Sequence, residues 1–217
     1  MIEKYQKKRK ICGKTDNQIE YLKKIYSNDL IIVNGPAGTG KSYCAIGNAV
    51  ISLQRKKYEK IIVAKPMRGA DVNLGALPGN IHQKIQFTFQ PFIDIFLDFI
   101  TENGFKELCQ NKIIDMFPIT YWRGLTFNDC YIIIDELQNC TVQQLKLIIS
   151  RMGQNSKMLL LGDVEQSDIT SKNAMQLCLE KKEKLEGIEG IAFQEMTDED
   201  LMRNKLINHI NKALFSV

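Results

Sequence analysis

Short apolar runs alternate along the chain with segments whose apolar residues recur at helical spacing. Four of the runs are rich in β-branched or aliphatic residues, stop at a glycine or a polar residue, and are predicted to be buried strands. They comprise residues 30–33, 61–64, 130–134 and 158–161. Helical spacing predicts helices at residues 17–26, 42–53 and 85–100, and along Leu145, Ile148, Ile149 and Met152. This alternation predicts an α/β fold with a mostly parallel sheet flanked by helices.

The remaining stretches are predicted to complete one domain. Residues 66–79 are rich in Gly and Pro and are expected to be mostly loop, and Pro91 is expected to start or kink the helix that contains it. Toward the carboxyl end, the pattern predicts a helix at residues 170–184, a last strand at 187–193 and a closing helix at 198–215. We therefore expect a single domain over residues 15–217, preceded by a basic arm at residues 1–14.

The composition fits one soluble domain. The 217 residues are 44% hydrophobic and 25% charged, which is ordinary for a chain that buries a substantial core. No apolar run approaches the roughly 20 residues of a membrane span, and the basic residues 1–10 lack the apolar stretch of a signal peptide. Six scattered cysteines form no Cys-x-x-Cys pair, so reduced thiols are expected rather than a zinc centre. These features favour a cytoplasmic protein with no membrane partner.

The net charge of +4 is unevenly distributed along the chain. Basic residues crowd the first 14 positions, and a second cluster lies at Arg55, Lys56, Lys57 and Lys60. Such clusters can bind the phosphates of a nucleic acid, but a solvated helix face or a disordered arm explains them equally well.

One glycine-rich segment carries the clearest chemical signal. It consists of Gly35, Pro36, Ala37, Gly38, Thr39, Gly40, Lys41 and Ser42. The segment fits the G-x-x-x-x-G-K-[ST] pattern in full and lies between a predicted strand and a predicted helix, as the pattern requires. Its backbone N–H groups are expected to face ATP phosphates, with Lys41 on the β and γ phosphates and the Ser42 hydroxyl on Mg²⁺. Tyr43, the next residue, is added to the predicted nucleotide contacts.

A carboxylate pair follows the third predicted strand. Asp135 and Glu136 come directly after the buried run at residues 130–134. Because a P-loop site needs a carboxylate on Mg²⁺ at the end of a neighbouring strand, Asp135 is predicted to be that ligand. Glu136 is predicted to be the catalytic base that polarises the attacking water, which favours an ATP-driven machine over a GTP switch. The alternative is an exposed acidic turn after a strand.

Two glutamines are candidates for contacts around the nucleotide. Gln166 follows the strand at residues 158–161 together with Asp163, and is predicted to sense the γ-phosphate or the water; the alternative is a plain turn. Gln18 lies shortly before the first strand, where its amide can pair with an adenine edge. The alternative for this stretch is a helix N-cap formed by Thr15 or Asp16.

Three arginines are candidates for the guanidinium that meets the charge building on the transferred phosphoryl group. They are Arg123, Arg151 and Arg203. Such a group can be supplied within the chain or by a neighbouring subunit. Each arginine has the alternative of a surface ion pair.

Taken together, these motifs resemble the PhoH family. The ATPase core of that family carries a Gly-Pro-Ala-Gly-Thr-Gly-Lys-Thr loop and an Asp-Glu-Ala-Gln-Asn motif, whose counterparts here are residues 35–42 and 135–139. Further similar segments are Leu-Gly-Ala-Leu-Pro-Gly at 74–79, Arg-Gly-Leu-Thr-Phe at 123–127 and Gly-Asp-Val-Glu-Gln at 162–166. The resemblance covers residues 14–217, nearly the whole chain.

Three positions depart from the family pattern. Lys65 stands before Pro66 where the family has Arg, Leu125 interrupts an Arg-Gly-Arg-Thr motif, and Met202-Arg203-Asn204 replaces Val-Arg-His. Lys65 keeps the positive charge but not the bidentate fork of an arginine, which weakens the expectation of phosphate sensing there.

The resemblance implies a RecA-like P-loop NTPase core with ATPase chemistry. Through the family's similarity to superfamily 1 helicases it also implies binding of single-stranded nucleic acid, with RNA favoured over DNA. Those helicases use two such cores, whereas this chain has length for one, so a homo-oligomer is expected, a hexameric ring by family analogy, with an arginine delivered across the interface. The compact length is similar to phage-encoded members, which would place the protein in the cytoplasm of an infected bacterium.

The leading hypothesis is an ATPase that couples hydrolysis to movement on, or remodelling of, single-stranded nucleic acid. Candidate phosphate contacts are the basic amino terminus, Lys65, Arg68 and Lys84. The second hypothesis is a regulatory or protein-remodelling ATPase without a nucleic-acid substrate. A small-molecule kinase is the third, although the sequence marks no acceptor site or arginine-rich lid.

Overall fold

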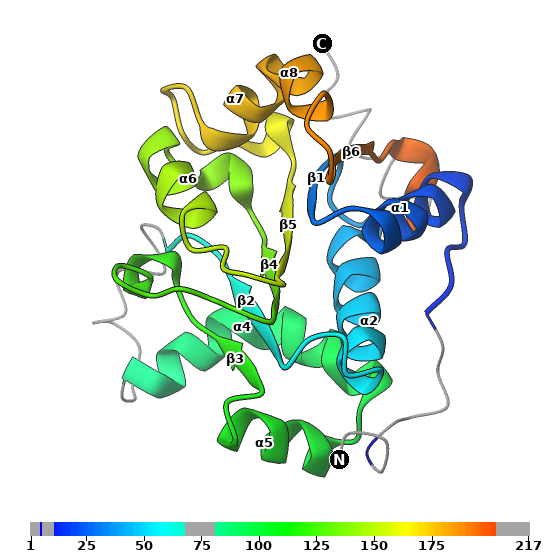
Figure 1. The fold of residues 1–217 in the computed structure, drawn as a ribbon, viewed down its shortest axis with the longest axis vertical. Coiled ribbons are helices and arrows are strands. Elements are labelled where there is room, and N and C mark those ends of the chain that lie inside the picture. The colour runs from blue at the N-terminus through cyan, green and yellow to red at the C-terminus, as the bar shows by residue number, and fades with distance from the viewer. Residues whose placement is uncertain (1–4, 6–10, 68–80, 203–217) are drawn as a thin grey trace, which may run out of the picture.

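A parallel β-sheet of six strands lies at the centre of the molecule (Figure 1). The computed structural model describes residues 5, 11–67 and 81–202, with the backbone alone for residues 81–87. The strands are β1 (Leu30–Asn34), β2 (Lys60–Ala64), β3 (Ile114–Met116), β4 (Cys130–Ile134), β5 (Lys157–Gly162) and β6 (Ile191–Glu195). Their order is β3-β2-β4-β5-β1-β6, and every pairing is parallel. The predicted α/β class is confirmed.

Helices cover both faces of the sheet (Figure 1). One face carries α1 (Asp16–Ser27), α2 (Lys41–Gln54), α4 (Ile81–Phe99) and α5 (Glu102–Gln110). The other carries α6 (Val142–Ile149), α7 (Ala174–Glu180) and α8 (Lys182–Glu186). Single 3₁₀ turns connect several elements: η3 (Ile119–Tyr121), η4 (Leu137–Asn139), η5 (Val164–Gln166) and η6 (Asp198–Asp200).

Two hydrophobic cores result from the alternation of side chains along the strands. Ile31 and Val33 of β1 face the core shared with α1, α2, α4 and α5, whereas Ile32 faces the core shared with α6 and α7. Tyr21 and Trp122 are fully buried, one in each core. Because the four inner strands β2, β4, β5 and β1 are buried on both faces, they read in the sequence as largely continuous apolar runs.

The strand order differs from the sequence-based expectation in one respect that matters for the site. The carboxylate pair was expected on a strand next to the one that precedes the glycine-rich loop, but β5 lies between β1 and β4. Asn34 of β1 pairs with Gly162 of β5, and Ile134 of β4 pairs with Leu160. The carboxyl ends of β1, β5 and β4 therefore meet at one edge of the sheet, and β5 supplies the middle of that edge.

Several predicted elements have different bounds in the structure. The helix expected at residues 170–184 begins only at α7, because Asn173 forms a capping box with Gln176, and α8 follows as a separate short helix. Met152 lies beyond the end of α6, and Ile149 at that end is 47% exposed. The helix α4 starts earlier than expected and continues through Pro91 instead of starting there.

The carboxyl end and the stretch before β4 also differ from expectation. The last strand begins at Ile191, later than expected, and the closing helix expected from Asp198 is a single 3₁₀ turn after which Leu201 is extended. Residues 203–215 of that prediction, and residues 68–79 of the expected loop, lie outside the described residues. The helix α5 and the three-residue strand β3 were not predicted.

Part of the predicted amino-terminal arm belongs to the domain. Ile11 packs against the core that contains α2, and Tyr5 accepts a backbone hydrogen bond from Thr101 of 2.8 Å. Residues 1–4 and 6–10, which hold most of the basic cluster, lie outside the described residues.

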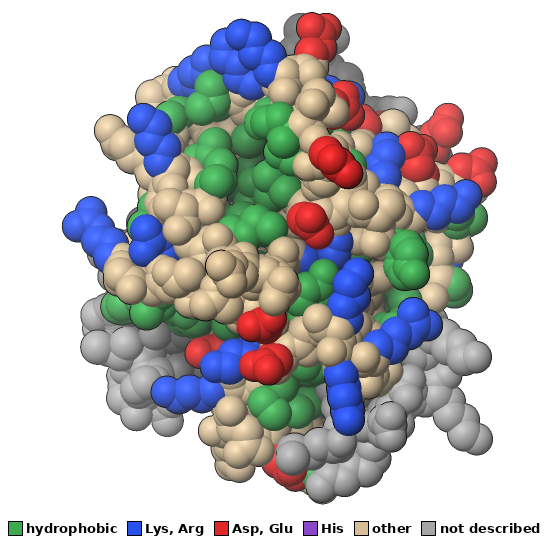
Figure 2. Space-filling model, in the orientation of Figure 1, with side chains coloured by type: hydrophobic (Ala, Val, Ile, Leu, Met, Phe, Trp, Pro, Cys, Tyr) green, Lys and Arg blue, Asp and Glu red, His purple; other side chains and the backbone are tan. Residues whose placement is uncertain are grey.

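The surface seen in Figure 2 mixes both signs of charge. On this face, Lys and Arg side chains are interspersed with Asp and Glu rather than gathered in one track.

Of the helices that the structure describes, none has the length and apolar character needed to cross a bilayer.

Candidate functional site

The glycine-rich loop connects β1 to α2 with a backbone that only glycine adopts easily. Gly35, Gly38 and Gly40 have φ angles of 144°, 90° and 86°. A Cβ atom on Gly35 would also lie 2.2 Å from the carbonyl oxygen of Met196, so a side chain there is excluded by contact as well as by conformation. The loop therefore keeps its N–H groups at the amino end of α2, where anions are favoured.

Lys41 lies over this loop. Its ammonium donates hydrogen bonds to the carbonyl oxygens of Gly35 and Pro36, the latter at 2.8 Å, and the residue is only 8% exposed. Thr39 is fully buried and fixes the turn by donating to the Pro36 carbonyl at 2.8 Å. The ammonium is thus held beside the space that the loop encloses, from which it can turn to phosphate oxygens.

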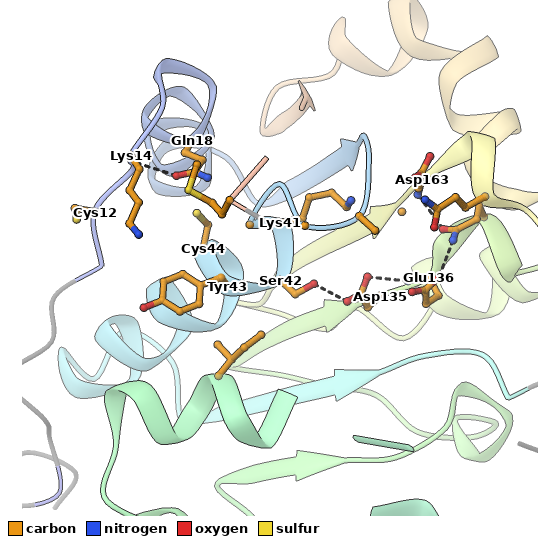
Figure 3. Close-up of a pocket in the computed structure, with 18 residues that line it drawn as sticks. Cys12, Lys14, Gln18, Lys41, Ser42, Tyr43, Cys44, Asp135, Glu136 and Asp163 are labelled. Atoms are coloured by element: carbon orange, nitrogen blue, oxygen red, sulfur yellow. Dashed lines mark hydrogen bonds between the residues drawn. The ribbon is translucent and has the colours of Figure 1, made fainter. Parts of the chain in front are cut away.

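Ser42 and Asp135 meet across the sheet edge. The Ser42 hydroxyl donates a hydrogen bond of 2.6 Å to Oδ2 of Asp135 (Figure 3). Asp135 is fixed in turn by its backbone N–H, which donates to the Ala64 carbonyl of β2 at 2.9 Å. A hydroxyl and a carboxylate are hard oxygen ligands, and Mg²⁺ binds proteins through one or two such groups while keeping waters and phosphate oxygens. The pair fits that cation.

Glu136 follows in a left-handed backbone conformation, with φ of 60°. Its N–H donates to Oδ1 of Asp135 at 2.9 Å, and its Oε2 accepts from Nε2 of Gln138 at 2.6 Å. The pKa of Glu136 is raised, first because the surrounding protein desolvates the carboxylate and second because Asp135 lies beside it. Although the residue retains exposed surface, it lines the pocket beside Asp135.

The turn after β5 faces the same space. Asp163 is 8% exposed and caps η5 by accepting a hydrogen bond of 3.1 Å from the Glu165 N–H. Gln166, at the end of that turn, is exposed and lines the pocket with Asp163. The turn expected as the alternative is therefore present, and it carries Gln166 toward the site; the sensing role of Gln166 stays a prediction.

These groups line a pocket of about 460 Å³. Its other side is formed by α1, by the residues just before it and by α4 (Figure 3). The lining there includes Cys12, Lys14, Gln18, Tyr43, Ile95 and Met202. Tyr43 is held in place against Phe99, with ring centroids 5.2 Å apart. The phosphate-facing groups and this mixed apolar and polar wall together give a cleft of the size and lining expected for a nucleotide.

Gln18 joins the two sides of the pocket. Thr15 forms the N-cap of α1 by accepting from the Gln18 N–H, so the capping alternative holds for Thr15. The Gln18 side chain is nevertheless buried, at 3% exposure; its Nε2 donates to the Thr39 carbonyl at 3.0 Å, and its Oε1 accepts from the Lys14 N–H at 2.8 Å. The amide is thereby oriented at the edge of the loop, and its contact with a base stays a prediction.

A buried carboxylate, Asp200, ties the segment after β6 to the start of α1. It accepts hydrogen bonds from the Thr15 hydroxyl, from Asn17 Nδ2 at 2.9 Å and from the Thr197 N–H at 2.7 Å. Burial alone would raise the pKa of Asp200, but these hydrogen bonds outweigh it and lower the pKa. Two residues further on, the Met202 N–H donates to the Gly38 carbonyl at 3.0 Å. The segment thus forms a wall of the pocket and contacts the loop.

Comparison with known proteins identifies the family. A family model described as PhoH-like protein matches residues 10–215. The chain belongs to the PhoH family. A PhoH-like protein of Bacillus subtilis (strain 168) is 38% identical over 212 residues, which are 98% of this chain and 66% of that protein. Protein PhoH of Escherichia coli (strain K12) is 32% identical over 198 residues, 90% of this chain and 56% of that protein. The chain thus spans between about half and two thirds of the length of these relatives.

Two solved structures also resemble this PhoH-family chain at low identity. Pif1 helicase from Candida albicans matches with a TM-score of 0.45 and 20% identity, over 93% of this chain and 44% of that one. The SWI2/SNF2 ATPase core of Sulfolobus solfataricus in complex with dsDNA matches with a TM-score of 0.47 and 15% identity, over 88% of this chain and 46% of that one. The family, together with the loop and carboxylates described above, makes the chain a P-loop NTPase.

The candidate arginines lie outside this pocket as far as the structure describes them. Arg151 is at the opposite, amino edge of the sheet, where its carbonyl accepts from the Phe127 N–H and its guanidinium donates to the Leu125 carbonyl at 2.7 Å. Arg123 is exposed on the connection that follows η3 and does not line the pocket. Arg203 lies outside the described residues. Neither described arginine therefore reaches this chain's own pocket.

Sequence reasoning missed several pocket residues of the PhoH-family chain. Cys12, Lys14, Ile95 and Met202 line the pocket, although none of them was a candidate site residue. Gln138 was noticed only as part of the Asp-Glu-x-Gln-Asn motif. That motif was the one available signal for Gln138, since an amide directly after a carboxylate pair is placed to bond it.

The cysteines are free thiols. Burial raises the pKa of Cys44 to about 12, and that of Cys130 and Cys178 to about 11. Among the described residues, His, Cys, Asp and Glu form no group of three or more that could hold a metal ion.

Proposed function

We propose that the protein binds ATP with Mg²⁺ and hydrolyses it, and that hydrolysis drives the binding or remodelling of single-stranded nucleic acid. The observation that carries the hydrolytic part is the 2.6 Å bond between Ser42 and Asp135, with Glu136 directly beside it at the edge of the P-loop. Six free cysteines suit a reducing compartment, which supports action in the cytoplasm.

The chemistry follows from these residues. The N–H groups of the loop and Lys41 hold the phosphates and offset their charge. Ser42 and Asp135 would hold Mg²⁺, which when bound neutralises charge that develops on the phosphoryl oxygens. Glu136 accepts a proton from the attacking water, a role that its raised pKa favours. In this proposal Gln166, which lines the pocket from the turn after β5, orients that water or contacts the γ-phosphate.

Water is a better acceptor here than a metabolite hydroxyl. The pocket is filled on its second side by α1, Tyr43 and Met202, and its size of about 460 Å³ suits one nucleotide. This supports a hydrolase over a small-molecule kinase.

The nucleic-acid part of the proposal rests on family resemblance and on charge. Lys65 follows β2 at the edge of the sheet that carries the site, and its charge acts on the Glu136 carboxylate. A phosphate of a nucleic-acid strand bound there would lie close to the catalytic base. RNA is preferred to DNA in the proposal, and binding is expected to weaken steeply as salt rises.

An arginine from a second subunit is part of the proposal. The pocket residues that the structure describes include no arginine, whereas phosphoryl transfer by P-loop enzymes is commonly assisted by one supplied in trans. We place this chain in a homo-oligomer, a hexameric ring by family analogy. Of the candidate arginines that the structure describes, Arg123 is the better one, because the guanidinium of Arg151 is already bonded to Leu125 and Ser150.

The proposal is tested by steady-state ATP hydrolysis with and without single-stranded RNA or DNA, at low and at moderate salt, with Glu136→Gln as the background control. Stimulation by one polynucleotide that disappears at higher salt would support a nucleic-acid-coupled ATPase and identify its substrate. Hydrolysis that neither polynucleotide changes would favour the second hypothesis, a regulatory or protein-remodelling ATPase.

A further inference from the structure

The turns that follow β4 and β5 are hydrogen-bonded to each other. The carbonyl of Gln138 in η4 accepts from the Ser167 hydroxyl at 3.1 Å, and Oδ1 of Asn139 accepts from the Asp168 N–H at 3.0 Å. Ser167 also accepts a hydrogen bond of 3.0 Å from Nδ2 of Asn173 at the start of α7. The turn η4, which Glu136 caps, and the turn η5, which ends at Gln166, therefore form one hydrogen-bonded unit.

The side chain of Gln138 makes the most direct link in this unit. Its Nε2 donates to Oε2 of Glu136 at 2.6 Å, and its Oε1 accepts from the Asp163 N–H at 3.0 Å. Gln138 is only 2% exposed; its bond to the Asp163 N–H is buried, and its bond to Glu136 is part-buried. A side-chain amide has a donor, the NH₂ group, and an acceptor, the carbonyl oxygen, side by side. It can therefore make both of these bonds at once.

The last residue of β5 makes room for this amide. A Cβ atom on Gly162 would lie 2.7 Å from Oε1 of Gln138. A larger residue at position 162 would push the amide away from the bonds that it makes to Glu136 and Asp163. The backbone of β5, the strand between β1 and β4, thus shapes the place where the amide sits.

We propose that Gln138 is a positioning residue that holds the Glu136 carboxylate for its role as base and couples it to the β5 turn carrying Gln166. This inference rests on the proposed hydrolysis at the same site. Gln138 acts through Glu136 and through the backbone of Asp163, the two groups to which its side-chain amide bonds. A displacement of the turn that carries Gln166, caused by a change near the γ-phosphate, thereby moves the Glu136 carboxylate. A displacement of that carboxylate likewise moves the turn.

Two substitutions at position 138 test these bonds: one removes both, and the other removes only the bond to Glu136. Gln138→Met keeps the length of the side chain but removes both hydrogen bonds. Gln138→Glu keeps an acceptor for the Asp163 N–H, removes the donor to Glu136 and places a second carboxylate against it. Both are expected to lower kcat by about 10- to 100-fold, the loss that follows when a reacting group is displaced by about 1 Å. The KM for ATP should stay within about twofold, because the loop and α1 are unchanged.

Gln143→Met is the matched control. Gln143 lies on the neighbouring helix α6, is exposed and lies outside the pocket lining, so this variant should hydrolyse ATP like the wild type. Melting temperatures and the affinity for a fluorescent ATP analogue are measured for all variants. A Gln138 that only supports the fold would lower the melting temperature and the affinity together with kcat.

Coupling is measured with Gln166→Ala and the double variant Gln138→Met/Gln166→Ala. If the two residues act as one unit, the double variant should lose no more than about the larger single loss, whereas independent losses would multiply. Multiplying losses, or a Gln138→Met variant as active as Gln143→Met, would overturn the inference while leaving hydrolysis by the wild type intact. A wild type that binds the analogue but does not hydrolyse ATP would overturn the proposed function, and this inference with it.

Discussion

The two sides of the pocket are built in different ways. The phosphate side consists of the glycine-rich loop that follows β1, the start of α2, and the side chains that follow β4 and β5. These parts meet at one edge of the sheet, where Ser42 of α2 bonds directly to Asp135. The other side of the pocket, which we call the α1 side, joins the start of α1 to the segment after β6. These parts of the chain lie at opposite ends of the sequence. Asp200 ties them together. The comparison suggests that the first side governs the rate of hydrolysis, and the second governs nucleotide affinity.

The largest effect should come from the phosphate side. Lys41→Ala removes the ammonium that meets phosphate charge, and we expect kcat/KM for ATP to fall by about 10²- to 10³-fold, as when one preorganised donor to a developing charge is lost. Lys146→Ala, an exposed lysine on α6, serves as the control and should be unaffected. Steady-state kinetics measure both variants, and a Lys41→Ala enzyme with near-normal kcat/KM would contradict the division into two sides.

A smaller effect should appear as a changed demand for metal. Ser42→Ala deletes the hydroxyl that bonds Asp135, and the Mg²⁺ concentration at half-maximal activity should rise by at least about tenfold, since losing even an outer partner of a metal site often costs that much. The readout is a Mg²⁺ titration of hydrolysis at saturating ATP. An unchanged titration curve would mean that the Ser42–Asp135 pair does not hold the cation.

A substitution on the α1 side should change the affinity for ATP. Asp200→Asn removes the charge that donors of Thr15, Asn17 and Thr197 share, so the wall formed around Met202 should loosen. The KM for ATP should then rise by about tenfold, equivalent to about 1.4 kcal/mol. The kcat should change little. Kinetics at several ATP concentrations distinguish the two, and a fall in kcat at constant KM would place Asp200 with the chemical groups instead.

The same carboxylate should make stability depend on pH. The folded state lowers the pKa of Asp200, so the carboxylate contributes stability that is present above the unfolded pKa of about 3.9 and is lost as pH falls through the lower folded value. Denaturant unfolding of the wild type and of Asp200→Asn should therefore differ by about 1 to 3 kcal/mol at pH 7 and converge in strong acid. A difference that stays constant down to the acid limit would show that the hydrogen bonds do not depend on the charge.

That the residues of the phosphate side meet at one edge of the sheet could be predicted from the sequence, because they obey local rules; their roles toward a nucleotide stay predictions. A strand, a glycine turn and a helix start follow one another in the chain at positions 30 to 42, and Asp135 follows a run of five buried residues. The class of the fold followed from the same alternation. The placement of β5 between β1 and β4 could not be read this way, because strand order is decided by packing between distant segments.

The arrangement of the α1 side could not be predicted from the sequence. Met202 and Lys14 line the same pocket, and the bonds of Asp200 to Thr15 and Asn17 help to join their two segments. No spacing or motif encodes these bonds. The closing helix was predicted from acidic residues after Thr197, but those residues form a capping box around a single turn, and Asp200 points to α1. Local helix-start signals were correct there, while the tertiary contact decided what followed.

The central claim, that this PhoH-family chain hydrolyses ATP with Glu136 as base, is tested most directly by comparing binding with turnover in Glu136→Gln. The amide keeps the shape of the side chain but cannot take the proton from water. We expect the variant to bind a fluorescent ATP analogue within about threefold of the wild type, and to lose hydrolysis by about 10²-fold or more, the contribution of a positioned general base. Equal hydrolysis by wild type and variant would contradict the account.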